Sequence, residues 1–238
     1  DFNADRILFA KTGKDSTTEI SNYTEPPPYL EFLNTYAKGE TINHFTTNND
    51  GQIAFAKLDE RTKTNKVVAL YDEYDASSEI IWDRSQLNSS DQMSPQFSKH
   101  NPEKYLAFLE NENAGSENFY LWILTGPFNG KVQKPIRIDG PVKTNRKDIY
   151  LNDLNFAWYP DGDIIFYIKR SDGSDDGSNP IYYYNVNTKS KKKLITNTQR
   201  NKYINIVGNK IVFTTTGLSS DAERYGRKAY VADLVIDP

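Results

Sequence analysis

Several residue types are scarce or missing in this sequence of 238 residues, which contains no cysteine, one methionine and two histidines. The lack of cysteine excludes disulfide frameworks, thiolate zinc sites and cysteine nucleophiles. No apolar run approaches the roughly 18 residues that a membrane helix needs, so no transmembrane segment is expected. The formal net charge is -3 without a clustered basic face, which argues against a nucleic-acid partner.

Aromatic residues are abundant instead, with 16 Tyr, 12 Phe and 3 Trp. Aromatic side chains suit pleated, half-buried surfaces, so this composition favours β-strands. The chain does not begin with Met, and Asp1 to Asp5 do not resemble a signal peptide. We therefore expect a mature, processed chain or a trimmed one.

One short pattern, an aliphatic residue, any residue and then phenylalanine, occurs five times at intervals of about 50 residues. The copies are Ile7-Leu8-Phe9, Ile53-Ala54-Phe55, Leu106-Ala107-Phe108, Ile164-Ile165-Phe166 and Ile211-Val212-Phe213. Four copies follow a residue that suits a tight turn, and four follow an extended run that contains an aromatic residue. The pattern therefore predicts a repeated β-hairpin.

Further strands are predicted after each hairpin. Third, apolar strands are predicted at residues 67–71, 119–123, 181–184 and 229–231, and fourth, more polar strands at 79–82, 134–138 and 193–195. The lysines between Lys189 and Lys193 suit the solvent side of an edge strand, where they discourage edge-to-edge pairing, and a phosphate or acidic-polymer site is the alternative there. Four antiparallel strands repeated at this interval are typical of β-propeller blades.

Residues 10–45 show no clear third strand. The best helix candidate in the chain is the segment 29–36, directly after Pro26-Pro27-Pro28. A strand at residues 29–33 is the alternative.

The most complete repeat spans residues 154–197. It reads Phe156-Ala157-Trp158-Tyr159-Pro160-Asp161-Gly162-Asp163-Ile164-Ile165-Phe166, and it continues through Ile181 to Thr188 and Lys193-Leu194-Ile195-Thr196. This arrangement resembles the TolB-type WD40-like (PD40) repeat: an aromatic residue, Pro-Asp-Gly, Ile-x-Phe and a short strand that ends in a Leu-Thr pattern. The resemblance implies an all-β fold, a β-propeller of four-stranded antiparallel blades.

Five hairpin repeats predict five blades, and six are the alternative because TolB-type propellers usually have six. We expect residues 1–238 to form a single propeller domain. The last repeat shows no fourth strand, so either the last blade has three strands or the native protein is longer than this chain.

The function implied by the resemblance is a non-enzymatic protein-binding or scaffold module, located in the periplasm, at the cell surface or in the secreted space of a bacterium. The expected partner is a protein or a peptide, with a carbohydrate as a second candidate. The alternatives are a five-bladed glycoside hydrolase and a lectin-like carbohydrate-binding propeller, because one fold hosts many functions.

No catalytic residue is assigned, since the sequence contains no Gly-x-Ser-x-Gly elbow. A glycosidase needs two carboxylates, and Asp153 is the nearest acid to a predicted first strand. His44 and His100 occupy different positions in the repeat, so the symmetry does not bring them together. We keep these three residues as candidates for ligand binding.

The remaining candidates are aromatic and acidic. Trp158 and Tyr183 would serve as stacking platforms if exposed and would otherwise pack between blades. The loop Asp172 to Asp176 resembles a calcium loop, but Tyr183 stands where an EF-hand requires glutamate. We therefore expect no cofactor and no metal, with a looser calcium site at this loop as the alternative.

Overall fold

A computed structural model describes residues 2–3, 6–12, 18–23, 30–35, 42–49, 52–59, 64–70, 78–80, 90–113, 116–128, 134–142, 155–170, 179–194, 196, 198, 200–215 and 228–236. Before residue 90, only the side chains of 46–49, 52–56 and 64 are described. No described segment forms a helix long and apolar enough to cross a membrane.

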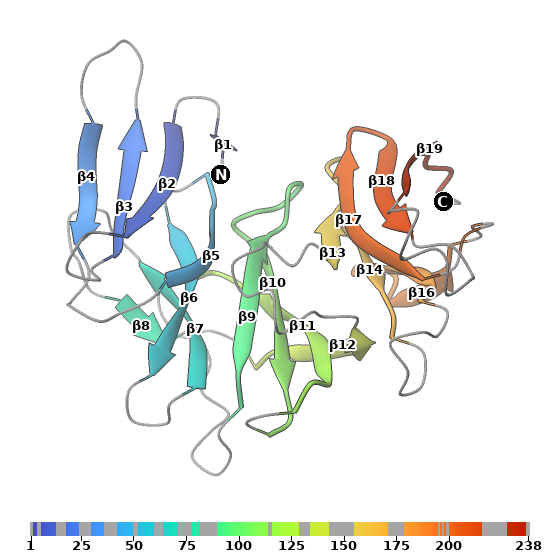
Figure 1. Ribbon diagram of the computed structural model, residues 1–238, viewed down its shortest axis with the longest axis horizontal. Coiled ribbons are helices and arrows are strands. Elements are labelled where there is room, and N and C mark those ends of the chain that lie inside the picture. Colours follow the sequence, from blue (N-terminus) through green and yellow to red (C-terminus); the bar gives the residue numbers. More distant parts are fainter. Residues whose placement is uncertain are drawn as a thin grey trace. The chain divides into compact units, whose positions relative to one another are not determined.

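All regular secondary structure in the described residues is β-strand (Figure 1). The strands are β1 (Phe2–Asn3), β2 (Arg6–Thr12), β3 (Thr18–Tyr23), β4 (Leu30–Thr35), β5 (Ile42–Thr47), β6 (Ile53–Asp59), β7 (Thr64–Leu70), β8 (Ser78–Ile80), β9 (Gln92–Phe97), β10 (Tyr105–Asn111), β11 (Phe119–Thr125), β12 (Ile136–Val142), β13 (Phe156–Trp158), β14 (Ile164–Ile168), β15 (Ile181–Asn185), β16 (Ser190–Lys193), β17 (Asn201–Val207), β18 (Lys210–Thr215) and β19 (Lys228–Asp233).

These strands form successive sheets, each made of neighbours in the chain. Their orders are β1-β2-β3-β4, β5-β6-β7-β8, β12-β11-β10-β9, β13-β14-β15-β16 and, with three described strands, β17-β18-β19. Antiparallel pairing is observed for β1–β2, β2–β3, β5–β6, β9–β10, β13–β14 and β17–β18. The fold is therefore all-β and belongs to the β-propeller class, as predicted, while the number of blades stays a prediction.

The repeated Ile-x-Phe pattern marks the second strand of every sheet, as the hairpin prediction requires. The helix expected at residues 29–36 is wrong, because β4 (Leu30–Thr35) pairs with β3 (Thr18–Tyr23) as an outer strand. Leu30 and Phe32 alternate with polar residues there, which fits a strand face. The sequence reading also missed β3, whose residues are mostly polar.

Burial is deepest in the second strands. Every residue of β10 and of β14 is buried, whereas three of the four residues of β16 and all of β19 are exposed. A strand that is covered on both faces must be apolar on both, which gives a continuous apolar run rather than alternation. This requirement explains why Ile-Ile-Phe-Tyr-Ile and Leu-Ala-Phe-Leu stand at these positions.

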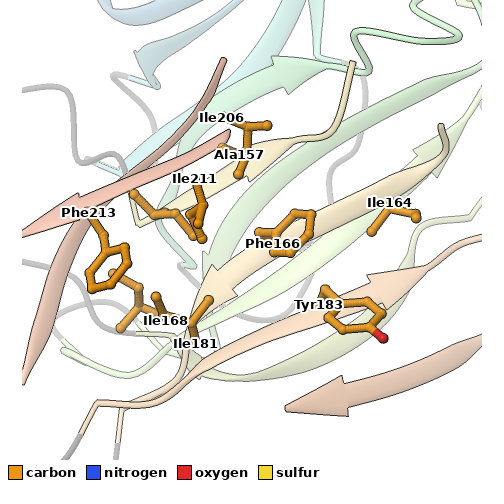
Figure 2. Close-up of a cluster of buried hydrophobic side chains, with 10 residues drawn as sticks. Ala157, Ile164, Phe166, Ile168, Ile181, Tyr183, Ile206, Ile211 and Phe213 are labelled. Atoms are coloured by element: carbon orange, nitrogen blue, oxygen red, sulfur yellow. The ribbon is translucent and has the colours of Figure 1, made fainter. Parts of the chain in front are cut away.

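The chain forms two compact units: residues 1–97, 102–116 and 122–136, and residues 98–101, 117–121 and 137–238. Each has its own apolar core. The first contains Ala54, Phe97, Leu106, Phe108, Leu124 and Phe128. In the second, Figure 2 shows side chains of β14 and β15, including Phe166, gathered with side chains of β17 and β18, including Phe213. The expected single domain stays a prediction.

The first strands of three sheets contain a β-bulge at the same position of the repeat. In β9 the register shifts opposite Phe108, and in β17 it shifts opposite Phe213. In β5 the shift falls at His44, between residues that pair with Ala56 and Phe55. The pairing of β13 with β14 shows no such shift. A bulge adds one residue to one strand and bends it.

Two of these bulges hold a side-chain-bearing residue in a left-handed backbone conformation. Ser94 in β9 has φ 53, and the equivalent Tyr203 in β17 has φ 52. This conformation places Cβ close to the following carbonyl oxygen and costs roughly 1–2 kcal/mol. The Ser94 hydroxyl is also buried and has no hydrogen-bond partner among the described residues.

We expect Ser94→Gly to stabilise the protein by about 1 kcal/mol, because glycine adopts this backbone without strain and the buried hydroxyl disappears. Urea unfolding monitored by tryptophan fluorescence measures the change. The control is the opposite substitution, Gly208→Ala, at a glycine with φ +56. An added Cβ would meet no atom within 4 Å there, so backbone strain alone should destabilise the protein by about 1 kcal/mol. Destabilisation by Ser94→Gly would show that the hydroxyl contributes to folding.

Candidate functional site

The most highly charged arrangement in the described residues surrounds Asp139 on β12, within the second unit. The Asp139 side chain is only 9% exposed. The Tyr167 hydroxyl donates to its Oδ2 at 2.7 Å, the Lys169 ammonium lies 3.1 Å from Oδ1, and the Lys191 ammonium lies 3.2 Å from Oδ2. One carboxylate therefore binds a phenol and two ammonium groups.

These contacts fix the charge states of the cluster. Burial by itself raises the pKa of Asp139, but hydrogen bonds from Tyr167, the Gly140 backbone, Lys169 and Lys191 outweigh burial and lower it. Burial, followed by the hydrogen bond to Asp139, raises the pKa of Tyr167 well above its ordinary value. At neutral pH Asp139 is therefore an anion, and Tyr167 is a neutral donor.

Tyrosine rings lie beside the two lysines. The Tyr167 and Tyr182 rings stack with their centroids 6.0 Å apart. The Lys169 ammonium lies 5.6 Å from the Tyr182 ring centroid, within cation–π range. By strand alternation, Tyr167, Tyr182, Tyr184, Lys191 and Lys193 share one face of the β13–β16 sheet, with Lys169 following on the same side. We call these six residues the lysine–tyrosine face.

Positive charge exceeds negative charge on this face. Lys169 and Lys191 share one carboxylate, and in the described part of the chain no other carboxylate lies within ion-pair distance of Lys169, Lys191 or Lys193. The Lys191 side chain is 41% exposed and that of Lys169 is 31% exposed. The face can therefore attract an anionic group from solution.

A second polar cluster lies in the first unit, at adjoining ends of β9 and β10. Glu110 is fully buried, and its Oε1 accepts hydrogen bonds from the Ser90 hydroxyl and the Gln92 amide, both at 3.0 Å. The Asn111 side-chain oxygen accepts the Asp91 backbone N–H at 2.7 Å. These hydrogen bonds link the two strands at a buried position.

A third carboxylate, Asp163, follows the Pro-Asp-Gly turn and is also buried. The Asn101 amide donates to both of its oxygens, at 2.8 and 2.9 Å, and the Asn187 amide donates at 3.1 Å. All three residues belong to the second unit. Asp163 therefore joins two turns that are distant in sequence, which is a structural role.

The two aromatic candidates, Trp158 and Tyr183, are both buried. Trp158 on β13 pairs with Ile165, whereas Tyr183 on β15 pairs with Phe166. Because adjacent residues of β14 point to opposite faces, Trp158 and Tyr183 lie on opposite faces of one sheet. The structure does not bring them together, and Tyr183 packs in the core shown in Figure 2. The ligand-binding role assigned to them stays a prediction.

The other candidates are dispersed or lie outside the described residues. His44 lies at the bulge of β5, where its side chain is not described, and His100 is exposed in a turn. Asp153 and the calcium candidate at Asp172–Asp176 lie outside the described residues. Among the described side chains, no group of three or more His, Asp or Glu could hold a metal ion.

Sequence reasoning missed Asp139 and its tyrosine and lysine partners as a site. These residues are separated by up to 52 positions and belong to the outer strand of one sheet and to three strands of the next. The run Lys189–Lys193 is the signal that the sequence offers, and it indicates protection of an edge, with a phosphate or acidic-polymer site as the alternative.

Comparison with known proteins supports the fold and changes the expected function. No protein-family model matches the chain, and no curated protein matches its sequence. Among solved structures, TolB from Acinetobacter baumannii is 18% identical with a TM-score of 0.61, and the match covers 97% of this chain and 50% of TolB.

Enzymes match over comparable lengths of this chain. An oligogalacturonate lyase in complex with manganese is 9% identical with a TM-score of 0.61, and the match covers 93% of this chain and 55% of the lyase. Acylaminoacyl peptidase from Pyrococcus horikoshii is 14% identical with a TM-score of 0.59, over 95% of this chain and 36% of the peptidase. The chain thus spans about half of TolB and of the lyase.

These likenesses confirm the β-propeller and a TolB-like arrangement of sheets, at identities that establish the fold alone. They contradict the expectation of a non-enzymatic binding or scaffold module. Propeller structures matched by this chain include peptidases, a puromycin hydrolase and a lyase, which are enzymes. A TolB-like fold therefore does not carry a TolB-like function with it.

We expect Asp139→Asn to lower the free energy of unfolding by about 1–3 kcal/mol at neutral pH, because the substitution removes a buried anion bound by three side chains. The pKa of Asp139 is lowered on folding, so the contribution is complete above its unfolded pKa of about 3.9 and is lost as pH falls through the folded value. Urea midpoints of both proteins across this range measure the effect.

The matched control is Asp233→Asn, which breaks the exposed Lys210–Asp233 pair and should cost less than about 1 kcal/mol. Equal effects of the two substitutions, or a difference from wild type that persists at low pH, would contradict the role assigned to Asp139.

We expect Glu110→Ala to destabilise the protein by about 2–3 kcal/mol, because the Ser90 hydroxyl and the Gln92 amide lose a buried acceptor. The neighbouring Glu112 is exposed, and Glu112→Ala should change stability by no more than about 0.5 kcal/mol. Thermal unfolding of the two variants provides the comparison, and similar melting temperatures would show that the buried cluster contributes little.

Proposed function

We propose that this chain is the β-propeller part of a peptidase. The observation that carries the proposal is the likeness of almost the whole chain to a fraction of longer peptidases, with 95% of this chain matched to 36% of acylaminoacyl peptidase. A puromycin-hydrolysing peptidase from Mycobacterium tuberculosis and tricorn protease also match. A propeller of this kind contributes binding surface to an enzyme whose reactive groups can lie elsewhere.

A further protease domain supports the same class. The β-propeller domain of the trilobed protease from Pyrococcus furiosus, whose structure is described as having an open velcro topology, matches 95% of this chain.

The second candidate is a lyase that acts on an acidic oligosaccharide, and the lysine–tyrosine face favours it. Elimination next to a carboxylate is assisted when positive groups neutralise that carboxylate in the transition state. The positive charge of three lysines on this face, Lys169, Lys191 and Lys193, exceeds the single negative charge of Asp139. Tyrosine rings of the same face can contact sugar rings. No metal ligand is assigned in this proposal.

We further propose that the repeats are of the PD40 type and that the protein works in the periplasm, at the cell surface or outside the cell. The Trp-Tyr-Pro-Asp-Gly turn of residues 158–162 supports the repeat type. The TolB-like fold and the lack of cysteine are compatible with an envelope protein.

Activity assays distinguish the two enzyme classes. We expect the full-length protein that contains this chain to release the fluorophore from acylaminoacyl and dipeptidyl amide substrates and to leave polygalacturonate intact. Formation of unsaturated sugar ends from polygalacturonate, detected by ultraviolet absorbance, would favour the lyase instead. Failure to convert either substrate set would overturn the proposal that the chain belongs to such an enzyme.

A further inference from the structure

The outer edge of β16 (Ser190–Lys193) is open. β16 is the terminal strand of its sheet, and no strand in the described part of the chain pairs with its other side. Lys191, Lys192 and Lys193 are exposed. An open edge presents unpaired backbone N–H and C=O groups that can pair with another extended chain.

The register shows which residues present those groups. The Leu194 N–H donates to the Ile181 carbonyl at 2.8 Å, and Lys193 lies opposite Tyr182. In an antiparallel ladder, hydrogen-bonded and non-hydrogen-bonded pairs alternate. Lys192 therefore pairs through its backbone with β15, whereas Lys191 and Lys193 direct their backbone N–H and C=O groups toward the open edge.

The same two residues carry the surplus charge. Lys191 and Lys193 belong to the lysine–tyrosine face, and Lys192 lies on the opposite face of the sheet. Asp139 holds the Lys191 ammonium in place and is itself fully occupied by hydrogen-bond donors. The edge thus combines outward backbone groups with positive side chains at alternate positions.

We propose that this edge binds an extended acidic peptide, which adds a fifth strand to the β13–β16 sheet and places acidic side chains opposite Lys191 and Lys193. Opposite charges at directly facing positions stabilise a strand pair, and like charges destabilise it. Main-chain hydrogen bonds supply affinity in this mode, and the alternating side chains supply specificity. The proposal rests on the proposed function in one respect, that the peptide is a substrate segment.

A peptide explains more of the geometry than an acidic sugar does. A sugar chain could use the lysine ammonium groups, but it has no regularly spaced amides to pair with the outward backbone groups of Lys191 and Lys193. The edge is also selective, because lysines at these positions repel a basic strand and a second copy of β16.

The test uses the whole protein and a fluorescently labelled hexapeptide of alternating glutamate and threonine, with binding followed by fluorescence anisotropy. Glutamates that face Lys191 and Lys193 would direct their own N–H groups at β16. N-methylation of the glutamates should therefore weaken binding about tenfold or more, whereas N-methylation of the threonines should be tolerated. Binding should also weaken as salt is raised.

Protein variants test the same arrangement from the other side. We expect Lys193→Glu to weaken binding of the peptide about tenfold. The matched control Lys192→Glu makes the same charge change on the opposite face of β16 and should alter binding less than about threefold. Both side chains are exposed, and equal urea midpoints would establish that both variants fold.

Equal binding of the two N-methylated peptides would overturn strand addition, and so would a complete lack of binding by the unmodified peptide. Tighter binding of polygalacturonate with the same loss in Lys193→Glu would identify an acidic-sugar site instead. Binding is measured without turnover, so a peptide that binds but is not cleaved leaves the docking edge intact while contradicting the peptidase. Cleavage of peptides that does not depend on Lys193 would support the peptidase and contradict the docking edge.

Discussion

Burial of the second strand of the repeat, complete in β10 and β14, is the constraint on which the rest of the structure depends. A strand covered on both faces cannot alternate apolar and polar residues, so β10 and β14 are apolar almost throughout. Phe108 and Phe166 lie at corresponding positions of the repeat, each in the apolar core of its unit. The register shifts of β9 and β17 fall opposite the Phe of their repeats, whereas β13 pairs with β14 without a shift.

The three buried carboxylates described above lie near strand ends or on an outer strand. Glu110 lies near the end of a buried strand and accepts hydrogen bonds from Ser90 and Gln92 at Oε1, while Asp163 precedes a buried strand and accepts hydrogen bonds from Asn101 and Asn187. Asp139, on an outer strand, is satisfied by Tyr167 and two lysines. Each buried carboxylate accepts hydrogen bonds from groups distant in sequence, because a buried anion without such donors would cost several kcal/mol. These three sites connect elements that apolar packing alone would not align.

The parts of the fold that the sequence predicted are those in which one residue pattern has one physical cause. Ile-x-Phe recurs because the second strand of each sheet needs apolar residues. The third strands and the Pro-Asp-Gly hairpin could be located from the position of this pattern. The strand β3 (Thr18–Tyr23) was missed because its mostly polar composition resembles that of a loop, although it lies between β2 and β4 in its sheet. The segment 30–35 has Leu and Phe at spacings that suit a helix or a strand, and only its pairing with β3 decides between them.

The site was harder to predict, since proximity across sheets leaves no local pattern. Asp139 and Lys191 are adjacent because one outer strand meets the face of the next sheet, which no spacing in the sequence encodes. Trp158 and Tyr183, candidates chosen by residue type, are buried on opposite faces of one sheet, and their ligand-binding role stays a prediction.

The lysines of β16 illustrate how one feature serves stability and recognition together. Positive side chains on an open edge protect the folded protein from pairing with copies of itself, since like charges would then face each other. The same charges lower the free energy of pairing with an acidic strand. The lysines that disfavour a second copy of β16 therefore favour an acidic partner. Asp139 strengthens this selectivity because it fixes Lys191 beside the edge and neutralises only one of the neighbouring cations. A fold that leaves its outermost strands exposed therefore gains a binding surface wherever their charge is of one sign.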